Sequence, residues 1–349
     1  MKPQSLSGFA RRLRREWRLL DLPSEQQSAI LAVSGGADSA SLLAACAELK
    51  IAKKLGLNFI VAHFDHRLRD AESDLDVEFA GKLAARFEFD FVCRKWNRSS
   101  EITHLKENLE QAARKARYRF LIETAEKSGA FAVLTGHTLN DQAETFLLRL
   151  IRGSSLDGLG AMRQVRIFEL EEHSETRNLK SKIQLVRPLL NWATRETTEE
   201  YCRASGIKFR LDSMNLNEKF SRVRVRRELL PLLKTFNPKI IKQLAQTARL
   251  FAEDAEELNS SAKKLLETAA ADSALDTKVL KKAAAAKRRR TIRLWLEKER
   301  GSLRVLEAKH LIAIDNLLMQ GAGGSFIELP GGEIVLKKRG LLFFQRHKG

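Results

Sequence analysis

The sequence predicts an α/β protein in which a parallel-sheet domain precedes a smaller, mainly helical domain. Short apolar runs alternate with helical patterns through the first two-thirds of the chain, as is typical of a parallel sheet covered by helices on both faces. After Pro231 the pattern changes to helical segments rich in Ala, Lys and Leu. The 349 residues exceed the roughly 250–300 that one core supports, so we expect two domains, 1–235 and 236–349.

Apolar runs predict the strands of the first domain at residues 29–33, 57–62, 89–93, 131–134 and 183–186. Helical patterns follow at residues 39–49, 74–87, 103–128, 141–150 and 194–205. Gly206 ends the last of these helices. Residues 163–182 are polar and charged without a period, so we expect a surface insertion there.

The second domain is expected to be wholly helical over residues 238–320. Residues 326–336 predict two short strands around a Pro-Gly-Gly turn, and residues 341–344 a third strand. At the other end of the chain, residues 9–17 are rich in arginine and amphipathic. We expect a packed first helix or a basic helix that touches RNA, with an organellar transit peptide as the alternative.

Composition limits the classes of partner and of site. The formal net charge of +18 favours a polyanionic partner, with nucleic acid first and an anionic membrane surface second, although a merely basic surface is an alternative. The three cysteines show no C-x-x-C spacing, which argues against a disulfide framework, a zinc site and an iron–sulfur cluster. They fit the cytoplasm, and no apolar run is long enough for a membrane helix.

The strongest local motif is the loop Ser34-Gly35-Gly36-Ala37-Asp38-Ser39, between the first expected strand and its helix. Adjacent glycines let the backbone bend and expose N–H groups, and a helix N-terminus adds positive potential. Together with the two serine hydroxyls these groups form a cradle for phosphate oxygens. Asp38 would face a phosphate most naturally through a bridging Mg²⁺ ion. The alternative is a plain strand–helix turn with Asp38 and Ser39 as a cap.

This loop resembles the PP-loop of the N-type ATP pyrophosphatases, whose fold is the adenine nucleotide α-hydrolase-like parallel sheet. The resemblance implies that ATP is cleaved between its α- and β-phosphates. A carbonyl-type oxygen would be adenylated, and a nucleophile would then displace AMP.

Further motifs resemble those of lysidine synthetases within that superfamily. His63-Phe-Asp65-His66-Arg-Leu-Arg closes the second expected strand, and we place His63 and Asp65 in the ATP site. Metal ligation by these side chains is the alternative reading. The helix containing Glu110, Arg114, Arg117 and Tyr118 matches a second motif, in which Arg114 would neutralise the leaving pyrophosphate.

The segment Gly136 to Thr145 matches a third motif and departs from it at Thr138 and Asn140. His137 and the carboxylates Asp141 and Glu144 are retained, and Asp141 would hold the ammonium group of lysine or orient magnesium. For the preceding motif, the helix with Glu110 and Arg114, an ordinary salt-bridged helix is the alternative. Arg152, which follows this helix, would contact a nucleotide backbone.

The last motifs lie around Arg187-Pro188, Arg195-Glu196, residues 212–215 and residues 222–231, with Val223 where the family usually has asparagine. Arg222 and Arg226 are candidates for binding RNA phosphates, as are Lys281, Lys282 and the run 287–290. Leu329-Pro330-Gly331-Gly332 also resembles the substrate-binding region of the family. We expect no room for the additional C-terminal domain of longer members.

The resemblance as a whole implies ligation of L-lysine to C2 of the wobble cytidine of the isoleucine tRNA with a CAU anticodon. It implies ATP and Mg²⁺ as cofactors, Asp38 as the metal ligand, and Asp38, Arg114, His137 and Asp141 as catalytic residues. A homodimer is left open. The nearest rival is a tRNA thiolase, followed by a small-molecule synthetase and by a non-catalytic RNA-binding module.

Overall fold

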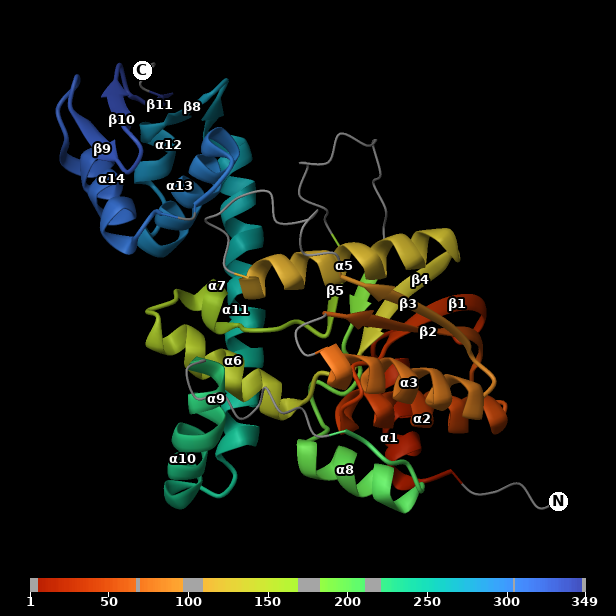
Figure 1. Ribbon diagram of the computed structural model, residues 1–349. Helices are drawn as coiled ribbons and strands as arrows, with labels where there is room; N and C mark the ends of the chain where they lie inside the picture. The colour runs from red at the N-terminus through yellow and green to blue at the C-terminus, as the bar shows by residue number, and fades with distance from the viewer. Residues whose placement is uncertain are drawn as a thin grey trace. The chain divides into compact units, whose positions relative to one another are not determined.

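The computed structural model describes residues 6–66, 70–96, 109–168, 183–210, 221–303 and 305–346 (Figure 1). The chain divides into two compact units, Met1–Leu250 and Phe251–Gly349. The division falls within one long helix, α11 (Ile240–Ala269). No helix in the described ranges is long and apolar enough to cross a membrane.

The first unit is built on a six-stranded sheet whose order is β3-β2-β1-β4-β6-β5. Its strands are β1 (Glu25–Ala32), β2 (Gly56–Asp65), β3 (Asp90–Lys95), β4 (Ala130–Thr135), β5 (Val165–Ile167) and β6 (Gln184–Val186). All neighbouring pairs are parallel except β5 with β6. The order reverses between β1 and β4, and open α/β sheets bind ligands at the carboxyl ends of strands beside such a switch point.

Helices cover both faces of this sheet (Figure 1). One face carries α1 (Gly8–Leu19), α2 (Ala37–Ile51), α3 (Asp70–Arg86) and α8 (Arg195–Ala204), and the other carries α5 (Leu109–Lys127). Helices α6 (Leu139–Ile151) and α7 (Leu156–Leu159) follow β4, and α6 packs against the helices that come after residue 221. The chain continues through α9 (Ser221–Arg224), a π-helical turn (Val225–Leu229) and α10 (Leu230–Phe236). The expected alternation of strands and helices is therefore confirmed.

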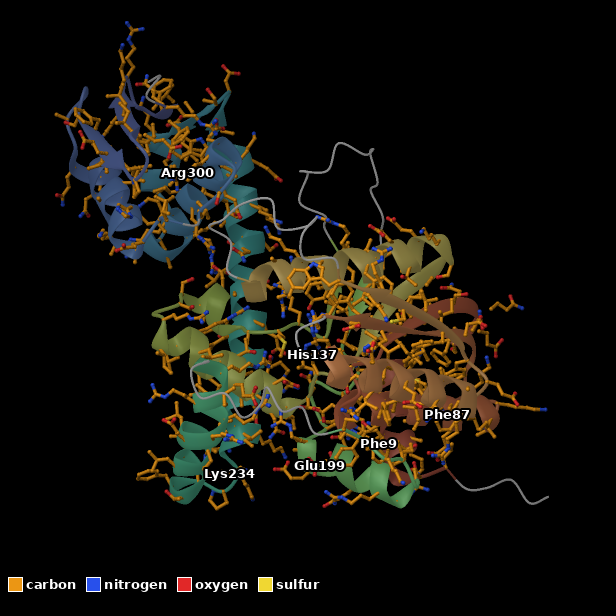
Figure 2. All side chains as sticks on the ribbon, viewed as in Figure 1. Phe9, Phe87, His137, Glu199, Lys234 and Arg300 are labelled. Atoms are coloured by element: carbon orange, nitrogen blue, oxygen red, sulfur yellow. The ribbon has the colours of Figure 1, made fainter. Side chains whose placement is uncertain are left out.

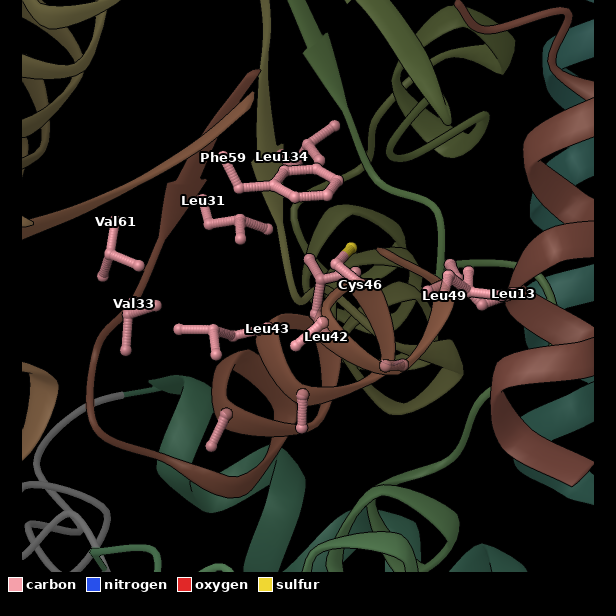
Figure 3. Packing of buried hydrophobic residues seen from close by; sticks show 14 of the residues in the cluster. Leu13, Leu31, Val33, Leu42, Leu43, Cys46, Leu49, Phe59, Val61 and Leu134 are labelled. Carbon is pink, nitrogen blue, oxygen red and sulfur yellow. The ribbon is translucent and has the colours of Figure 1, made fainter. Parts of the chain in front are cut away.

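Alternate residues of the central strands pack into two different cores, as the period of a β-strand requires. Leu31, Phe59 and Val61 lie in the core beneath α2, which Figure 3 shows from close by. Their neighbours Ile30 and Ile60 face the opposite core, beneath α5. Burial on both faces explains why these strands read as continuous apolar runs in the sequence.

Helix α1 is a packed element of the first unit. Leu13 and Trp17 are buried, and the indole nitrogen of Trp17 donates to the carbonyl of Pro23 at 2.8 Å. Phe9 stacks on Tyr201 of α8, with ring centroids 4.5 Å apart. The expectation of a packed first helix is confirmed.

The structure differs from one expectation for the first unit at strand β5. The sequence predicts a surface insertion throughout the polar stretch 163–182, but Val165–Ile167 pairs antiparallel with β6 at the edge of the sheet. Three residues are too few for an alternating pattern to be recognised. Residues 169–182 lie outside the described residues.

The second unit combines helices with a five-stranded antiparallel sheet of order β7-β8-β11-β10-β9. Its strands are β7 (Ala270–Ala271), β8 (Ala274–Asp276), β9 (Phe326–Leu329), β10 (Glu333–Lys338) and β11 (Leu341–Arg346). Its helices after α11 are α12 (Thr277–Lys281), α13 (Ala285–Arg300) and α14 (Ala308–Gln320). The three expected terminal strands are confirmed, whereas β7 and β8 interrupt a stretch for which the sequence predicts helix throughout.

Two basic side chains of the second unit hold its turns in place. Arg300, labelled in Figure 2, forms an ion pair with Glu333 and donates to the carbonyl of Pro330 at 2.8 Å, next to the turn at Gly331. The ammonium group of Lys337 donates to the carbonyls of Leu318 at 2.9 Å and Gly321 at 2.6 Å. The last carbonyls of a helix have no partner within the helix, so this ammonium group satisfies the end of α14.

Candidate active site

The loop that follows β1 has the geometry of a phosphate cradle. Gly35 adopts φ +94°, which an L side chain rarely does. The N–H of Ser34 donates to Ser39 Oγ at 3.1 Å, and that hydroxyl donates to the carbonyl of Gly36 at 3.0 Å. Ser39 therefore braces the loop, and no side chain caps α2 at Gly36. The uncapped N–H groups at the start of a 15-residue helix are suited to an anion.

The loop after β4 touches the phosphate loop through Gly136. A Cβ atom at this position would lie 2.6 Å from the carbonyl oxygen of Asp38 and 2.8 Å from the nitrogen of Ser39. Since both neighbours are backbone atoms, only glycine permits this approach. The two loops that follow β1 and β4 thus meet at the switch point of the sheet.

Asp38 lies at this junction, at the start of α2. Its carboxylate accepts a hydrogen bond from the Thr198 hydroxyl, and Oδ2 lies 4.0 Å from Nε of Arg195. Burial raises the pKa of Asp38 from 3.8 to about 6, although the bond from Thr198 acts in the opposite direction. A largely buried carboxylate with a raised pKa is suited to binding a cation.

A Mg²⁺ ion fits this position on the chemistry of the donors. Magnesium in nucleotide sites is held by one or two carboxylates together with phosphate oxygens and water, and Asp38 supplies a carboxylate beside the phosphate cradle. The described part of the chain contains no group of three or more acidic, His or Cys side chains that could hold a metal alone. The ion would therefore be held jointly with the nucleotide.

Helix α6 begins in the loop after β4 and places Asp141 close to Asp38. Asp141 Oδ2 accepts from the backbone N–H of Thr138 at 2.9 Å and from the Thr138 hydroxyl at 3.1 Å. Asp141 Oδ1 accepts from Arg222 at 3.0 Å. Asn140, the other departure from the family motif, accepts the N–H of Arg195 at 3.0 Å and so caps the first turn of α8. Both departures thus have a structural role.

Glu144 is fully buried one turn further along α6 and forms the centre of an arginine network. Arg226 donates to its two oxygens at 2.7 and 3.0 Å, Arg222 donates at 2.8 Å, and Arg195 donates at 3.4 Å. Burial alone would raise the pKa of Glu144, but the bond from Arg226 and the nearby arginine charges outweigh it and lower that pKa. Arg195 thereby links Glu144 to Asp38.

His137 lies in the first unit (Figure 2), where the charges of a second group of arginines act on it. Its Nδ1 lies 2.8 Å from the hydroxyl of Thr135. Burial, together with the charges of Arg187 and Arg117, holds the pKa of His137 well below 6.5. The imidazole is therefore neutral at neutral pH.

The end of β2 contributes His63 and Asp65, both buried. Nδ1 of His63 lies 2.8 Å from the carbonyl of Val33, directly before the phosphate loop. Burial lowers the pKa of His63, which favours the neutral ring. The position of both residues on the β2 side of the loop is compatible with a nucleotide that extends across β1 and β2.

Comparison with known protein families shows to which family of this fold the chain belongs. The PP-loop domain model matches residues 9–233, and the model of the TilS substrate binding domain matches residues 275–343. A tRNA(Ile)-lysidine synthase from Salinispora tropica is 33% identical over 93% of this chain and 92% of its own length. The chain belongs to the tRNA(Ile)-lysidine synthase family.

Other members of the family are longer. The chain is 34% identical to the enzymes of Dehalococcoides mccartyi and Geobacter sulfurreducens, over 88% and 91% of its own length, and it spans 64% of each of them. Among solved structures, a U34-tRNA thiolase from Methanococcus maripaludis matches with a TM-score of 0.54 and 14% identity, over 70% of this chain and 80% of that one. That likeness shows the shared fold.

Most of the residues predicted from the family motifs converge. Asp38, Asp141, Glu144, Arg222 and Arg226 form one connected network, and Arg114 and His137 lie in the second arginine group. Arg152 stands apart, exposed at the end of α6. Arg69, at the end of the motif after β2, lies outside the described residues, as do residues 212–215. The same is true of Glu107 and Asn108, with which the motif of α5 begins.

The motifs include Arg195 without giving it a role, and they do not include Thr198, although these two residues connect the network. Arg195 and Thr198 lie on the first turn of α8, far along the chain from the loops they join. Thr194 caps that helix by accepting the N–H of Thr197 at 3.3 Å. Besides the Arg195-Glu196 motif, a helix start directly after a predicted strand and loop is the sequence signal that points to them.

Proposed function

We propose that the protein joins L-lysine to C2 of the wobble cytidine of the isoleucine tRNA with a CAU anticodon, as an ATP-dependent ligase that forms a carbon–nitrogen bond. The observation that carries this proposal is the contact between two loops, in which a phosphate cradle with Asp38 adjoins the carboxylates Asp141 and Glu144. The family of the chain and its substrate-binding domain support the choice of substrates.

ATP enters as a substrate on the phosphate loop. The N–H groups at the start of α2 and the hydroxyl of Ser34 bind its phosphates. The β2 side of the loop, with His63 and Asp65, holds the nucleoside. A Mg²⁺ ion on Asp38 would neutralise charge on the phosphates. The oxygen at C2 of cytosine, which is a poor leaving group, then attacks the α-phosphate, releasing pyrophosphate and leaving an adenylated base.

Lysine binds on the α6 side of the loop. Both oxygens of Glu144 are already bonded to arginine, whereas Asp141 Oδ1 is shared with Arg222, whose side chain is 39% exposed. We assign the ammonium group of lysine to Asp141, where it would take the place of Arg222. The ammonium group loses a proton to water, the amine then forms a bond to C2, and the bond between C2 and its oxygen breaks as AMP leaves with that oxygen. His137, being neutral, can accept a hydrogen bond from the amine.

The wobble base must leave the anticodon stack to reach this site, as for other enzymes that modify a base. The charge of the chain favours RNA, since it carries an excess of 18 positive charges. We assign the second unit, Phe251–Gly349, to tRNA binding because the substrate-binding model covers most of it.

A thiolase activity is less well supported by the cysteines of the described chain. Cys46 and Cys202 are buried, and Cys93 is half-buried. Burial raises the pKa of Cys202 to about 12 and also raises that of Cys46, so neither forms the thiolate that sulfur transfer needs.

Transfer of label from ATP tests the proposal step by step. With α-³²P-ATP and the CAU-anticodon tRNA but no lysine, label should become attached to the RNA, and adding lysine should release it as AMP. Labelled RNA that lysine does not discharge, or ATP cleavage to ADP, would contradict the assignment.

A further inference from the structure

The stretch 195–210, which contains α8 and the residues after it, contacts the phosphate loop at two places. Near its start, the hydroxyl of Thr198 donates to Asp38, at the helix end of the loop. At its end, the backbone N–H of Arg210 donates to the carbonyl of Gly35 at 3.0 Å, at the glycine turn. This second contact is made by a backbone donor, so it depends on what holds Arg210 beside the turn.

Asp76 of α3 holds Arg210 in that place. Its Oδ1 accepts a hydrogen bond from Nε of Arg210. The same oxygen lies against the turn, because a Cβ atom at Gly35 would be 3.4 Å from it. Burial lowers the pKa of His63, and the charge of Asp76 acts in the opposite direction, so this carboxylate is also close to the end of β2. Asp76 therefore contacts both the side chain of Arg210 and the backbone of the phosphate loop.

Stability alone does not explain this ion pair. The side chains of Asp76 and Arg210 are 31% and 32% exposed, and ion pairs that water reaches contribute little to folding. Arg86, also on α3, donates to the carbonyls of Ser205 at 3.1 Å and Gly206 at 3.0 Å, so the end of α8 has a separate anchor on α3. The position of the pair beside the phosphate loop is better explained by a role in that loop.

The bond from Arg210 fixes the orientation of the peptide between Gly35 and Gly36. Gly35 has φ +94°, and glycine adopts positive and negative φ about equally readily, so this peptide plane can turn over at little steric cost. In a trans peptide the carbonyl and the N–H point to opposite sides.

With the carbonyl of Gly35 bonded to Arg210, the N–H of Gly36 faces away from Arg210 and can join the N–H groups at the start of α2. Successive N–H groups directed to one side form a concave site for an anion. The reversed peptide would present a carbonyl oxygen to a phosphate and repel it. The orientation of one peptide thus decides whether the turn attracts or repels phosphate.

We propose that Asp76 is a positioning residue for the phosphate loop, which holds Arg210 so that its backbone keeps the N–H of Gly36 directed to bound phosphate. Asp76 itself need not touch ATP. A donor that is already oriented loses no free energy to reorientation when the ligand binds. The proposal rests on the proposed function for its ligand, the phosphates of ATP.

Binding of ligands with and without phosphate tests this role. Asp76→Ala and Arg210→Ala should each weaken pyrophosphate and ATP by about tenfold, the effect of one lost hydrogen bond, with adenosine affinity unchanged. The double variant should be no weaker than either single variant, because the two side chains act through one contact. Arg210→Lys keeps a charge for Asp76 and should restore most of the affinity. Titration calorimetry gives these values.

Arg203→Gln is the matched control. Arg203 lies on α8 and forms an exposed ion pair with Glu199 at 2.7 Å, so this variant also loses a partly exposed pair. Its affinities for pyrophosphate, ATP and adenosine should equal those of the unaltered protein. If Asp76→Ala fails to fold, Asp76→Asn keeps the shape of the side chain, loses its charge, and should weaken pyrophosphate in the same direction.

The amide of Gly36 gives a readout that a purely structural role of Asp76 would not change. In the intact chain with ¹⁵N-labelled glycine, pyrophosphate should shift the Gly36 amide resonance, which Gly36→Ala identifies by its loss. At equal saturation with pyrophosphate, the shift should be much smaller in Asp76→Ala and in Arg210→Ala, and it should be retained in Arg203→Gln.

The proposal is overturned if Asp76→Ala and Arg210→Ala bind pyrophosphate as tightly as the unaltered protein, or if adenosine affinity falls as much as ATP affinity. An undiminished shift of Gly36 in both variants would also overturn it. Failure of the proposed function has a different signature. In that case pyrophosphate binding would still depend on Asp76, but no lysine would enter the tRNA.

Discussion

The hydroxyl of Thr198, on the first turn of α8, donates a hydrogen bond to the carboxylate of Asp38, on the first turn of α2. Thr198 is fully buried, and its hydroxyl lies 2.8 Å from the carbonyl of Arg195 as well. A hydroxyl has one proton, so the two acceptors share it. This hydrogen bond fixes the orientation of the only carboxylate in the phosphate loop.

Thr198→Val should therefore lower the rate of adenylation by about tenfold while leaving the fold intact, since the substitution conserves volume and removes one hydrogen bond. Thr198→Ser keeps the hydroxyl and is the matched control. Single-turnover rates for both variants, with thermal melting to check folding, measure the effect. Equal rates for Val and Ser would show that the hydroxyl does not orient Asp38.

Asp38→Ala should nearly abolish adenylation, by orders of magnitude, because it removes the carboxylate that would bind magnesium.

Asp38→Asn should also be inactive, yet more stable. Since burial raises the pKa of Asp38 to about 6, the folded state favours the protonated form, and stability is lost as pH rises from about 3.8 through 6.

Above pH 6 the buried, ionised carboxylate of Asp38 destabilises the folded state. At pH 8 the free energy of unfolding should therefore be about 1–2 kcal/mol higher for Asp38→Asn than for the unaltered protein. This value is lower than the full pKa shift would give, because the side chain is partly exposed. Activity of the unaltered protein should rise with pH through about 6. Urea denaturation at pH 4 and pH 8 tests the sign, and an equal effect at both values would contradict it.

Glu144→Gln should destabilise the first unit by about 2–4 kcal/mol, because it leaves three arginines around a buried neutral side chain. Arg226→Gln should cost less, since Glu144 would keep Arg222 and Arg195. Chemical denaturation of both variants gives the comparison. A larger loss of stability for Arg226→Gln would mean that the network is not centred on Glu144.

Asp141→Asn should impair transfer of lysine more than adenylation, so that adenylated tRNA accumulates in a single turnover. Thr138 can still donate to the amide oxygen, so the start of α6 should persist. If both steps fall equally, Asp141 acts on ATP or magnesium rather than on the amine.

The structure divides the basic run 287–290 into different roles. Arg288 is buried and forms an ion pair with Asp315, which Arg289 also contacts at 2.7 Å. Removing Arg288 should destabilise the second unit by about 3 kcal/mol. Binding of RNA is better tested with Lys281→Gln, Lys282→Gln and Lys287→Gln together.

That triple variant should weaken tRNA binding and lower its salt slope by roughly 0.7–0.9 for each phosphate that is no longer neutralised, with ATP affinity unchanged. The measurement is tRNA affinity at several salt concentrations. Unchanged affinity would assign the binding of RNA to other arginines of the chain.

Local patterns are enough to predict the sheet and the phosphate loop, because buried parallel strands and a glycine turn leave signals within a few residues. They cannot reveal that Arg195 and Thr198 complete the loop, since this depends on where α8 packs. Charge alone predicts that Arg222 and Arg226 bind RNA phosphates. Both are turned toward Glu144, which only the tertiary structure shows.

Incorporation of labelled lysine into tRNA measures the proposed ligation itself. The protein is incubated with ATP, labelled lysine and tRNAs with and without the CAU isoleucine anticodon, and the RNA is digested to nucleosides. We expect label in one modified cytidine, only with ATP and only in the CAU-anticodon isoleucine tRNA. Absence of labelled nucleoside, with ATP and tRNA both shown to bind, would contradict it.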